Sequence, residues 1–166
     1  MNELKQNVID YLRGHNAMSL ATTRDGRPHA ATVFYVNSQF DLFFLSSPSS
    51  RHGQHLATNN RVAATVNEDY GTWNDIKGLQ IEGYVEQIGP LSANRKIADE
   101  FVAKFPGTSM FFQDPDEMPD PVAAKVAKVQ FYRLRPTRIF YIDNSQGFGH
   151  REELPVDDFT PFEEQA

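Results

Sequence analysis

The chain has 166 residues, a length typical of one domain with one continuous core. Hydrophobic residues make up 40% and charged residues 23%, with thirteen Phe and six Tyr, which excludes disordered and fibrous classes and favours strands. The formal net charge of -6 argues against non-specific nucleic-acid binding, which needs a broad basic surface.

Much of the negative charge lies near the C-terminus, at Glu152, Glu153, Asp157, Asp158, Glu163 and Glu164. We interpret residues 1–154 as the domain and residues 155–166 as an acidic, solvated tail, with a specific docking role for the tail as the alternative. Without this segment the chain is close to neutral, so a local cluster of donors could still hold an anionic cofactor.

The absence of cysteine excludes disulfides, thiolate metal sites and cysteine nucleophiles, so any redox chemistry must come from a bound cofactor. His52 and His55 lie three residues apart, but no third ligand has supporting spacing, and we expect no metal site. No apolar run approaches the ~20 residues that span a bilayer, and the chain does not start with a signal peptide's apolar core. We therefore expect a cytoplasmic protein that binds neither membrane nor nucleic acid.

The first third of the chain predicts a helix followed by an antiparallel meander. Apolar residues three to four apart predict a helix over 2–13. Strands are predicted over 18–23, 29–36 and 41–45, and the Asp-Gly pair within 24–27 supplies the first turn. These strands are expected to pair in sequence.

The middle of the chain alternates short helices with longer strands. A short helix is predicted over 51–60, and strands over 62–67 and 79–88 follow it. Helical spacing of apolar residues over 92–105 predicts another helix, with Ser92 as its N-cap.

The last part predicts a loop and two strands. Residues 107–121 lack clear periodicity and predict a long loop carrying at most a turn of helix. Strands are predicted over 126–134 and 137–142, with a kink or edge at Arg135-Pro136. Several short strands with few helices favour a mainly β fold, an antiparallel β-barrel, over alternating βαβ units.

The most informative stretch runs from Leu42 to Leu56, where an apolar strand opens into hydroxyls and a basic pair at a helix start. Hydroxyls and free N–H groups at a helix N-terminus point donors at an anion, and Arg51 adds a bidentate fork. The residue types therefore indicate phosphate recognition. An ordinary capped helix with Arg51 in solvent is the alternative.

Several short motifs, taken in order, resemble the pyridoxamine 5'-phosphate oxidase-like flavoproteins. The motifs are Gly26-Arg27-Pro28-His29, Val33-Phe34-Tyr35, Phe44-Leu45-Ser46, Ser50-Arg51-His52, Asn59-Asn60-Arg61-Val62, Leu79–Val85 and Tyr132–Ile139. The resemblance runs from about Met18 to Arg151. It implies a six-stranded antiparallel split barrel that binds FMN as a homodimer, with each flavin site shared between two chains.

The resemblance also implies which residues hold FMN. Ser46, Ser50, Arg51 and His52 would ring the phosphate beside Leu45, with His52 where the oxidases usually have lysine. The strand along the isoalloxazine ring would be Ala31, Thr32, Val33, Phe34, Tyr35 and Val36. Lys77 and Gly78 would approach from the next strand pair. Tyr141 and Arg151 would close the site, although Tyr141 replaces a tryptophan and could simply pack in the barrel.

Departures from the family pattern argue against a true vitamin B6 oxidase. The oxidases grip the substrate phosphate with a tyrosine, an arginine and a serine where this chain has Phe101, Phe105 and Ser109. Their Arg-x-His substrate pair coincides with Gly147-Phe148-Gly149. We therefore hypothesise an apolar pocket edge, with ordinary core packing as the alternative, built from Phe101, Phe105, Met110, Phe111, Phe112 and Phe148.

The resemblance implies an FMN-dependent oxidoreductase that transfers hydride or electrons to or from an unidentified small molecule. Flavin carries the electrons itself, so no catalytic side chain is assigned. One alternative is a flavin- or haem-binding module for storage or sensing. Another is a haem-degrading enzyme with His52 or His150 as ligand.

Overall fold

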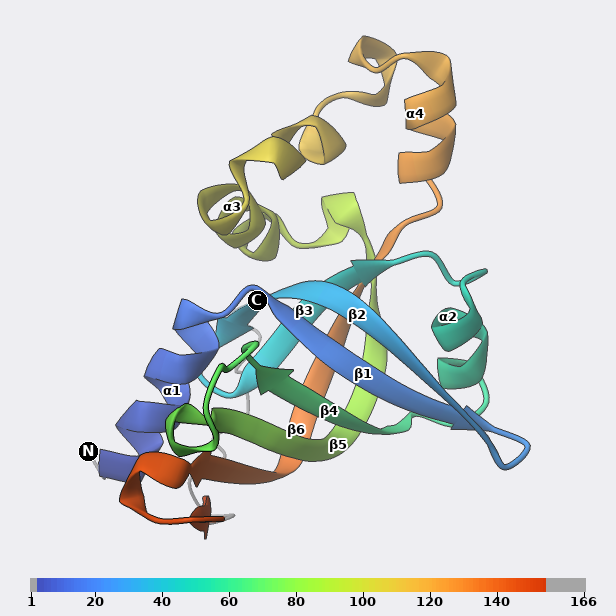
Figure 1. Cartoon of the computed structure of the whole chain (residues 1–166). Helices are drawn as coiled ribbons and strands as arrows, with labels where there is room; N and C mark the ends of the chain where they lie inside the picture. The colour runs from blue at the N-terminus through green and yellow to red at the C-terminus, as the bar shows by residue number, and fades with distance from the viewer. Residues whose placement is uncertain (1–2, 155–166) are drawn as a thin grey trace.

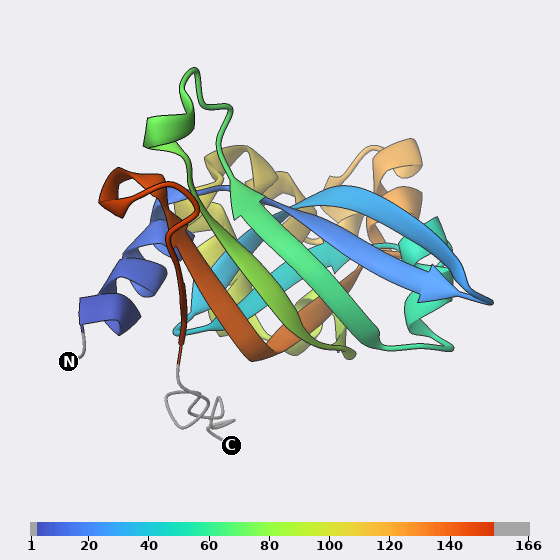
Figure 2. The ribbon, with the colours of Figure 1, turned by 60° about the horizontal axis from the view of Figure 1, so that its bottom comes forward.

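The computed structural model describes residues 3–154, so the acidic tail predicted at 155–166 lies outside the described residues. Seven antiparallel strands form one sheet in the order β3-β2-β1-β4-β5-β6-β7 (Figure 1). A further pairing of β3 with β6 closes six strands into a barrel, which Figure 2 shows from its side, and β7 adds an extra strand. The predicted six-stranded antiparallel barrel is confirmed.

The barrel strands are longer than predicted, and short helical turns join them. The strands are β1 Ala17–Arg24, β2 Arg27–Ser38, β3 Asp41–Ser46, β4 Arg61–Asn67, β5 Lys77–Pro90, β6 Gln130–Asp143 and β7 Arg151–Glu153. The α-helices are α1 Glu3–Gly14, α2 Arg51–Leu56, α3 Arg95–Lys104 and α4 Asp120–Val126. The 3-10 turns are η1 Trp73–Asp75, η2 Leu91–Ala93, η3 Pro106–Phe112, η4 Pro115–Glu117 and η5 Asn144–Gln146.

The barrel interior is filled by side chains that alternate along each strand. In β4, Val62, Ala64 and Val66 are buried while the residues between them face solvent. Helix α1 covers one side of the barrel with its buried residues Val8, Ile9 and Leu12 (Figure 1). Burying an aliphatic side chain of this size stabilises the fold by about 1.5–3 kcal/mol, so this alternation fixes the register of the strands.

A second core lies outside the barrel, under α3. Its buried members are Val36, Phe43, Ile97, Ala98, Phe101 and Phe131. Figure 1 shows α3 and α4 in a layer beyond the barrel, and α3 contacts β2. None of the helices within residues 3–154 is long and apolar enough to cross a membrane.

The two strands predicted on either side of Arg135-Pro136 are one continuous strand, β6, and the kink predicted there is a bulge within it. The pairing with β5 shifts register between Glu82 and Gly83, which face Arg138 and Pro136, so one residue of β6 bulges out. A Cβ atom at Gly83 would lie 2.3 Å from the Arg135 carbonyl oxygen. Glycine on the neighbouring strand therefore makes room for the bulge that accommodates proline.

Three other element boundaries differ from the predictions. The strand predicted from 126 begins only at Gln130, because α4 occupies the preceding residues. The predicted loop over 107–121 contains η3, η4 and the start of α4. Helix α3 starts at Arg95, and its N-cap is Asn94, whose side chain accepts a hydrogen bond from Ile97 N–H at 3.1 Å.

The first hairpin turn follows the prediction, and the helix predicted over 51–60 is shorter than predicted. Asp25 and Gly26 have φ values of 51° and 71°, the left-handed backbone that a two-residue hairpin turn requires. The helix predicted over 51–60 forms as α2 but ends at Leu56.

Candidate functional site

The end of β3 and the first turn of α2 bring hydroxyls and a histidine together. Ser46 Oγ lies 2.5 Å from His52 Nε2 and 3.2 Å from Ser50 Oγ. Ser50 also caps α2, because its hydroxyl accepts a hydrogen bond from Gly53 N–H at 3.0 Å. Because Ser50 already accepts the hydrogen bond of the Gly53 N–H group, the polar groups left for a ligand at this corner are mainly side chains.

Gly53 allows α2 to approach the preceding loop closely. A Cβ atom there would lie 2.6 Å from the Ser47 carbonyl oxygen and 2.8 Å from that of Pro48. Real side chains never approach a backbone oxygen so closely. The glycine therefore sets the helix against the loop and holds His52 next to Ser46.

Two further histidines surround this corner. The rings of His29 and His52 are parallel, with centroids 6.4 Å apart, and His29 makes an edge contact with His55 at 5.8 Å. His55 is buried, and its Nδ1 lies 3.1 Å from Thr22 Oγ1. Sequence reasoning did not include His29 and His55 in the site, although His29 alternates with half-buried Ala31 along β2.

A guanidinium and imidazole rings lie together at the corner, and none of them forms an ion pair with a carboxylate of the described chain. Burial, followed by His29 and His55, lowers the pKa of His52 below its ordinary value. Burial, followed by Arg51 and His55, lowers the pKa of His29. Within residues 3–154, no carboxylate forms an ion pair with Arg51, which is exposed, or with either histidine. The Ser46–His52 corner is therefore suited to an added anion.

One edge of β2 runs away from this corner with free backbone groups. Tyr35 N–H donates to Asn16 O at 3.1 Å, so alternate residues of β2 bond toward β1. The N–H and C=O groups of Thr32 point to the other edge. In the described chain β3 pairs with β2 only from Tyr35 onwards. This edge can therefore donate to and accept from a ligand.

The side chains of this strand do not all face the open edge. Phe34 is 63% exposed and lies 5.1 Å, between ring centroids, from Phe105. Tyr35 is fully buried and donates its hydroxyl to Leu12 O at 2.8 Å, and Val36 belongs to the second core. Tyr35 and Val36 can therefore offer a ligand only backbone groups. Thr32 is exposed, and Ala31, Val33 and Leu45 are half-buried.

The other predicted site residues lie at the opposite end of the barrel. Lys77 Nζ lies 3.5 Å from Asp143 Oδ2, and the Arg151 guanidinium lies 3.7 Å from the centroid of the Phe140 ring. Gly78 pairs with Ile142. Tyr141 is buried in the barrel core, as the packing alternative predicts.

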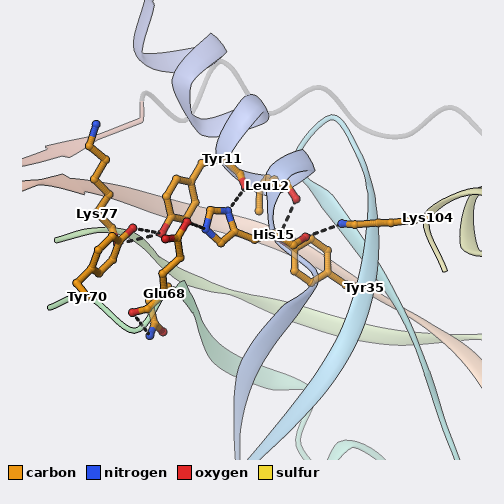
Figure 3. Close-up of polar contacts among 9 residues, drawn as sticks. Tyr11, Leu12, His15, Tyr35, Glu68, Tyr70, Lys77 and Lys104 are labelled. Atoms are coloured by element: carbon orange, nitrogen blue, oxygen red, sulfur yellow. Dashed lines mark hydrogen bonds and ion pairs between the residues drawn. The ribbon is translucent and has the colours of Figure 1, made fainter. Parts of the chain in front are cut away.

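A hydrogen-bonded network fixes this end to α1 (Figure 3). Tyr11 donates its hydroxyl to Lys77 O at 3.0 Å and lies 3.0 Å from the Tyr70 hydroxyl. His15 Nδ1 lies 2.6 Å from Tyr11 O, and its Nε2 lies 2.7 Å from Glu68 Oε1. These contacts join the start of β5 to the end of α1.

One chain does not bring the two groups of predicted residues together. Strand β4 begins at Arg61, shortly after α2, and ends at Asn67, which pairs with Gly78. The six steps from Arg61 to Asn67, at ~3.3 Å each, separate the two ends by roughly 20 Å. Figure 2 shows α2 and η5 at opposite ends of the barrel. A site that contains both groups requires two chains.

The predicted aromatic pocket edge is wrong in two members. Phe101 is buried in the second core. Phe148 is 84% exposed and contacts Trp73 edge-on at 5.6 Å, far from α3. Asn144 holds this aromatic pair in place, because its side chain donates to Trp73 O at 2.8 Å and accepts from Gly149 N–H at 3.1 Å.

Comparison with known proteins identifies the family. A family model described as pyridoxamine 5'-phosphate oxidase matches residues 4–143. The chain belongs to this family. A UPF0306 protein of Klebsiella pneumoniae (strain 342) is 26% identical over 143 residues, which cover 85% of this chain and 86% of that protein. Such relatives carry no assignment as oxidases, so family membership does not extend to vitamin B6 oxidation.

Solved structures of the same fold bind different cofactors. A FAD-binding protein from Mesorhizobium loti has a TM-score of 0.60 and 18% identity, with coverage of 84% of this chain and 92% of that chain. A heme-binding protein from Mycobacterium smegmatis has a TM-score of 0.67 and 15% identity, with coverage of 91% and 58%. At these identities the likeness shows the fold alone.

Proposed function

We propose that the chain is an FMN-binding oxidoreductase that works as a homodimer. The observation that carries the proposal is the Ser46–His52 corner, where hydroxyls, imidazoles and a guanidinium meet without a carboxylate partner in the described chain. A guanidinium binds phosphate oxygens through strong, bidentate, charge-assisted hydrogen bonds, and hydroxyls add neutral donors. A phosphate monoester is the anion that such a donor set suits.

The residues present suit FMN along its whole length. Ser46, Ser50, Arg51 and His52 would hold the phosphate, and His29 would add a further nitrogen donor. The free edge of β2 at Thr32 would offer backbone groups to the polar edge of the ring. Bound flavin would supply hydride or electron transfer, while the protein orients the ring and tunes its surroundings.

The second chain of a dimer would complete each site. Lys77 and Arg151 lie about one barrel length from the corner of their own chain, so we assign them to the flavin site of the partner. The exposed Trp73 and Phe148 lie at the same end and would cover apolar parts of the ring or substrate. Two-fold symmetry would then give two identical shared sites.

The substrate is expected to be less anionic than a B6 phosphate. Phe101 and Phe105 stand where the oxidases have polar groups, and Phe101 is buried. The 147–149 segment carries no charge. The exposed Phe34 and half-buried Phe105 instead provide an apolar wall beside the free edge of β2.

The absorption spectrum of the purified full chain tests the cofactor, and anaerobic mixing with NADH or NADPH tests the activity. We expect a yellow protein that releases FMN on denaturation, and bleaching of its flavin band that oxygen or another acceptor reverses. A chain that stays colourless with excess FMN would contradict flavin binding. A flavin band that neither donor bleaches would leave a storage or sensing role.

Haem binding is a second candidate, because three histidines lie at the corner. His29 and His52 have lowered pKa values, and His55 is buried. Neutral imidazole is the form that ligates iron. A haem titration of the flavin-free chain would show a Soret shift that His52→Ala removes. An unchanged haem spectrum would exclude this candidate.

A further inference from the structure

A basic pocket of about 470 Å³ lies between α3, the end of α1 and the turn between β2 and β3. Three cations line it, Arg13 from the last turn of α1 and Lys96 and Lys104 from α3. Its floor is apolar and belongs to the second core, at Val36, Phe43 and Ile97. Pockets of this volume commonly hold small molecules.

The basic pocket lies next to the Ser46–His52 corner along β3. Phe43 lines the pocket, and Ser46 of the corner follows it by three strand residues at ~3.3 Å each, so roughly 10 Å separates the two. Val36 also borders the pocket and is the last residue of the strand that we assign to the flavin ring. An anionic head in the pocket and a phosphate at the corner would occupy different positions.

Lys104 is held at the wall of the pocket by two contacts. Its Nζ donates to His15 O at 2.6 Å and lies 4.4 Å from the centroid of the Tyr35 ring (Figure 3). An ammonium has three N–H donors, and within residues 3–154 His15 O is its one hydrogen-bond acceptor. Burial lowers the pKa of Lys104 to about 8, and an anion beside it would offset that cost.

Two cations of the pocket, Arg13 and Lys104, form no ion pair within residues 3–154. Glu100 is the one carboxylate in its lining, and it forms no ion pair in the part of the chain that the structure describes. Arg13 and Lys104 are therefore available to an added anion.

We propose that the basic pocket binds a small organic anion with an apolar body. Arg13 and Lys104 would bind the anionic head, and the floor of the second core would bind the body. Neither the cations nor the apolar floor would bind a ligand tightly alone, because water and salt screen the charges and the floor is small. This proposal does not depend on flavin binding at the corner.

Calorimetric titration of the full chain with octanoate tests the proposal. We expect one site per chain, and at least tenfold weaker binding of octanol, which lacks the charge, and of inorganic phosphate, which lacks the body. Lys104→Gln and Arg13→Gln should each weaken octanoate binding about tenfold, as loss of one charge-assisted hydrogen bond does. Lys104→Arg should restore it, and Lys125→Gln on α4 should leave it unchanged.

Two outcomes would overturn the proposal. The first is equal octanoate binding by the original chain and by Arg13→Gln, whose exposed side chain can change without loss of folding. The second is loss of octanoate binding in the Arg51→Gln variant, because the probe would then occupy the corner. Thermal melting of each variant separates loss of binding from loss of folding.

Discussion

His52 Nε2 lies 2.5 Å from Ser46 Oγ, and this contact joins the first turn of α2 to the end of β3. Gly53 makes the contact possible, because any side chain there would collide with the Ser47 carbonyl oxygen. The corner is therefore built by backbone packing before any ligand binds. Its nitrogen groups are therefore held in position to bind an anion.

The affinity for FMN should depend on pH through His52. Burial and the neighbouring histidines lower its pKa in the free protein, so the ring is neutral at pH 7, whereas a bound phosphate raises it. Binding then takes up a proton, and affinity should fall by about tenfold or less per unit as pH rises from 6.5 to 8.5. Titrations at several pH values measure this slope.

The matched variants for this pH dependence are His52→Gln and His15→Gln. His52→Gln should flatten the slope, while His15→Gln, at the other end of the barrel, should keep it. A slope that survives in His52→Gln would show that another group takes up the proton.

Shared sites should allow two defective chains to rescue each other. Arg51→Gln removes the corner's guanidinium, and Arg151→Gln removes the group assigned to the partner. A mixed dimer contains one intact site, so unfolding and refolding an equal mixture should restore tight binding to about a quarter of the sites. The number of FMN molecules bound per chain at low FMN concentration measures this fraction. Absence of rescue, with both variants dimeric, would place the whole site in one chain.

Gly83→Ala should destabilise the barrel. The new methyl group would lie 2.3 Å from Arg135 O, in the backbone of the neighbouring strand, so the bulge at Pro136 must shift. Overpacking of this kind costs about 1–3 kcal/mol in the free energy of unfolding. Urea denaturation measures the loss. Gly71→Ala, which meets nothing within 4 Å, is the control, and an equal effect of both variants would contradict the account.

Lys104 should make the protein more stable as pH rises above 8. Its folded pKa of about 8 is below its unfolded value, so between the two the unfolded chain binds the extra proton. The free energy of unfolding should rise by about 1 kcal/mol from pH 8 to 9.5, discounted because the ammonium is half exposed. Lys104→Met should abolish the rise, and an unchanged profile would contradict the assignment.

Local patterns predicted most strands and the cluster of hydroxyls and histidine at the start of α2. Alternation in β4 and the Asp25-Gly26 turn depend on neighbours in sequence, and so do the hydroxyls that precede Arg51. Family resemblance added the number of strands in the barrel. These features were accessible because each is encoded within a few residues.

Features that depend on distant partners were missed. The continuity of β6 through Pro136 depends on Gly83 in another strand, so proline alone predicted a break. His29 joins the corner only because β2 and α2 meet in space. The separation of Lys77 and Arg151 from Arg51 is a property of the closed barrel and cannot be read from spacing along the chain.

Comparing FMN with riboflavin, which lacks the phosphate, tests the central claim most directly. Quenching of flavin fluorescence by the full chain gives both affinities. Two charge-assisted hydrogen bonds contribute about 3 kcal/mol together, so FMN should bind about 100-fold more tightly, and Arg51→Ala should remove most of the difference. Equal affinities for FMN and riboflavin would contradict a phosphate site at the Ser46–His52 corner.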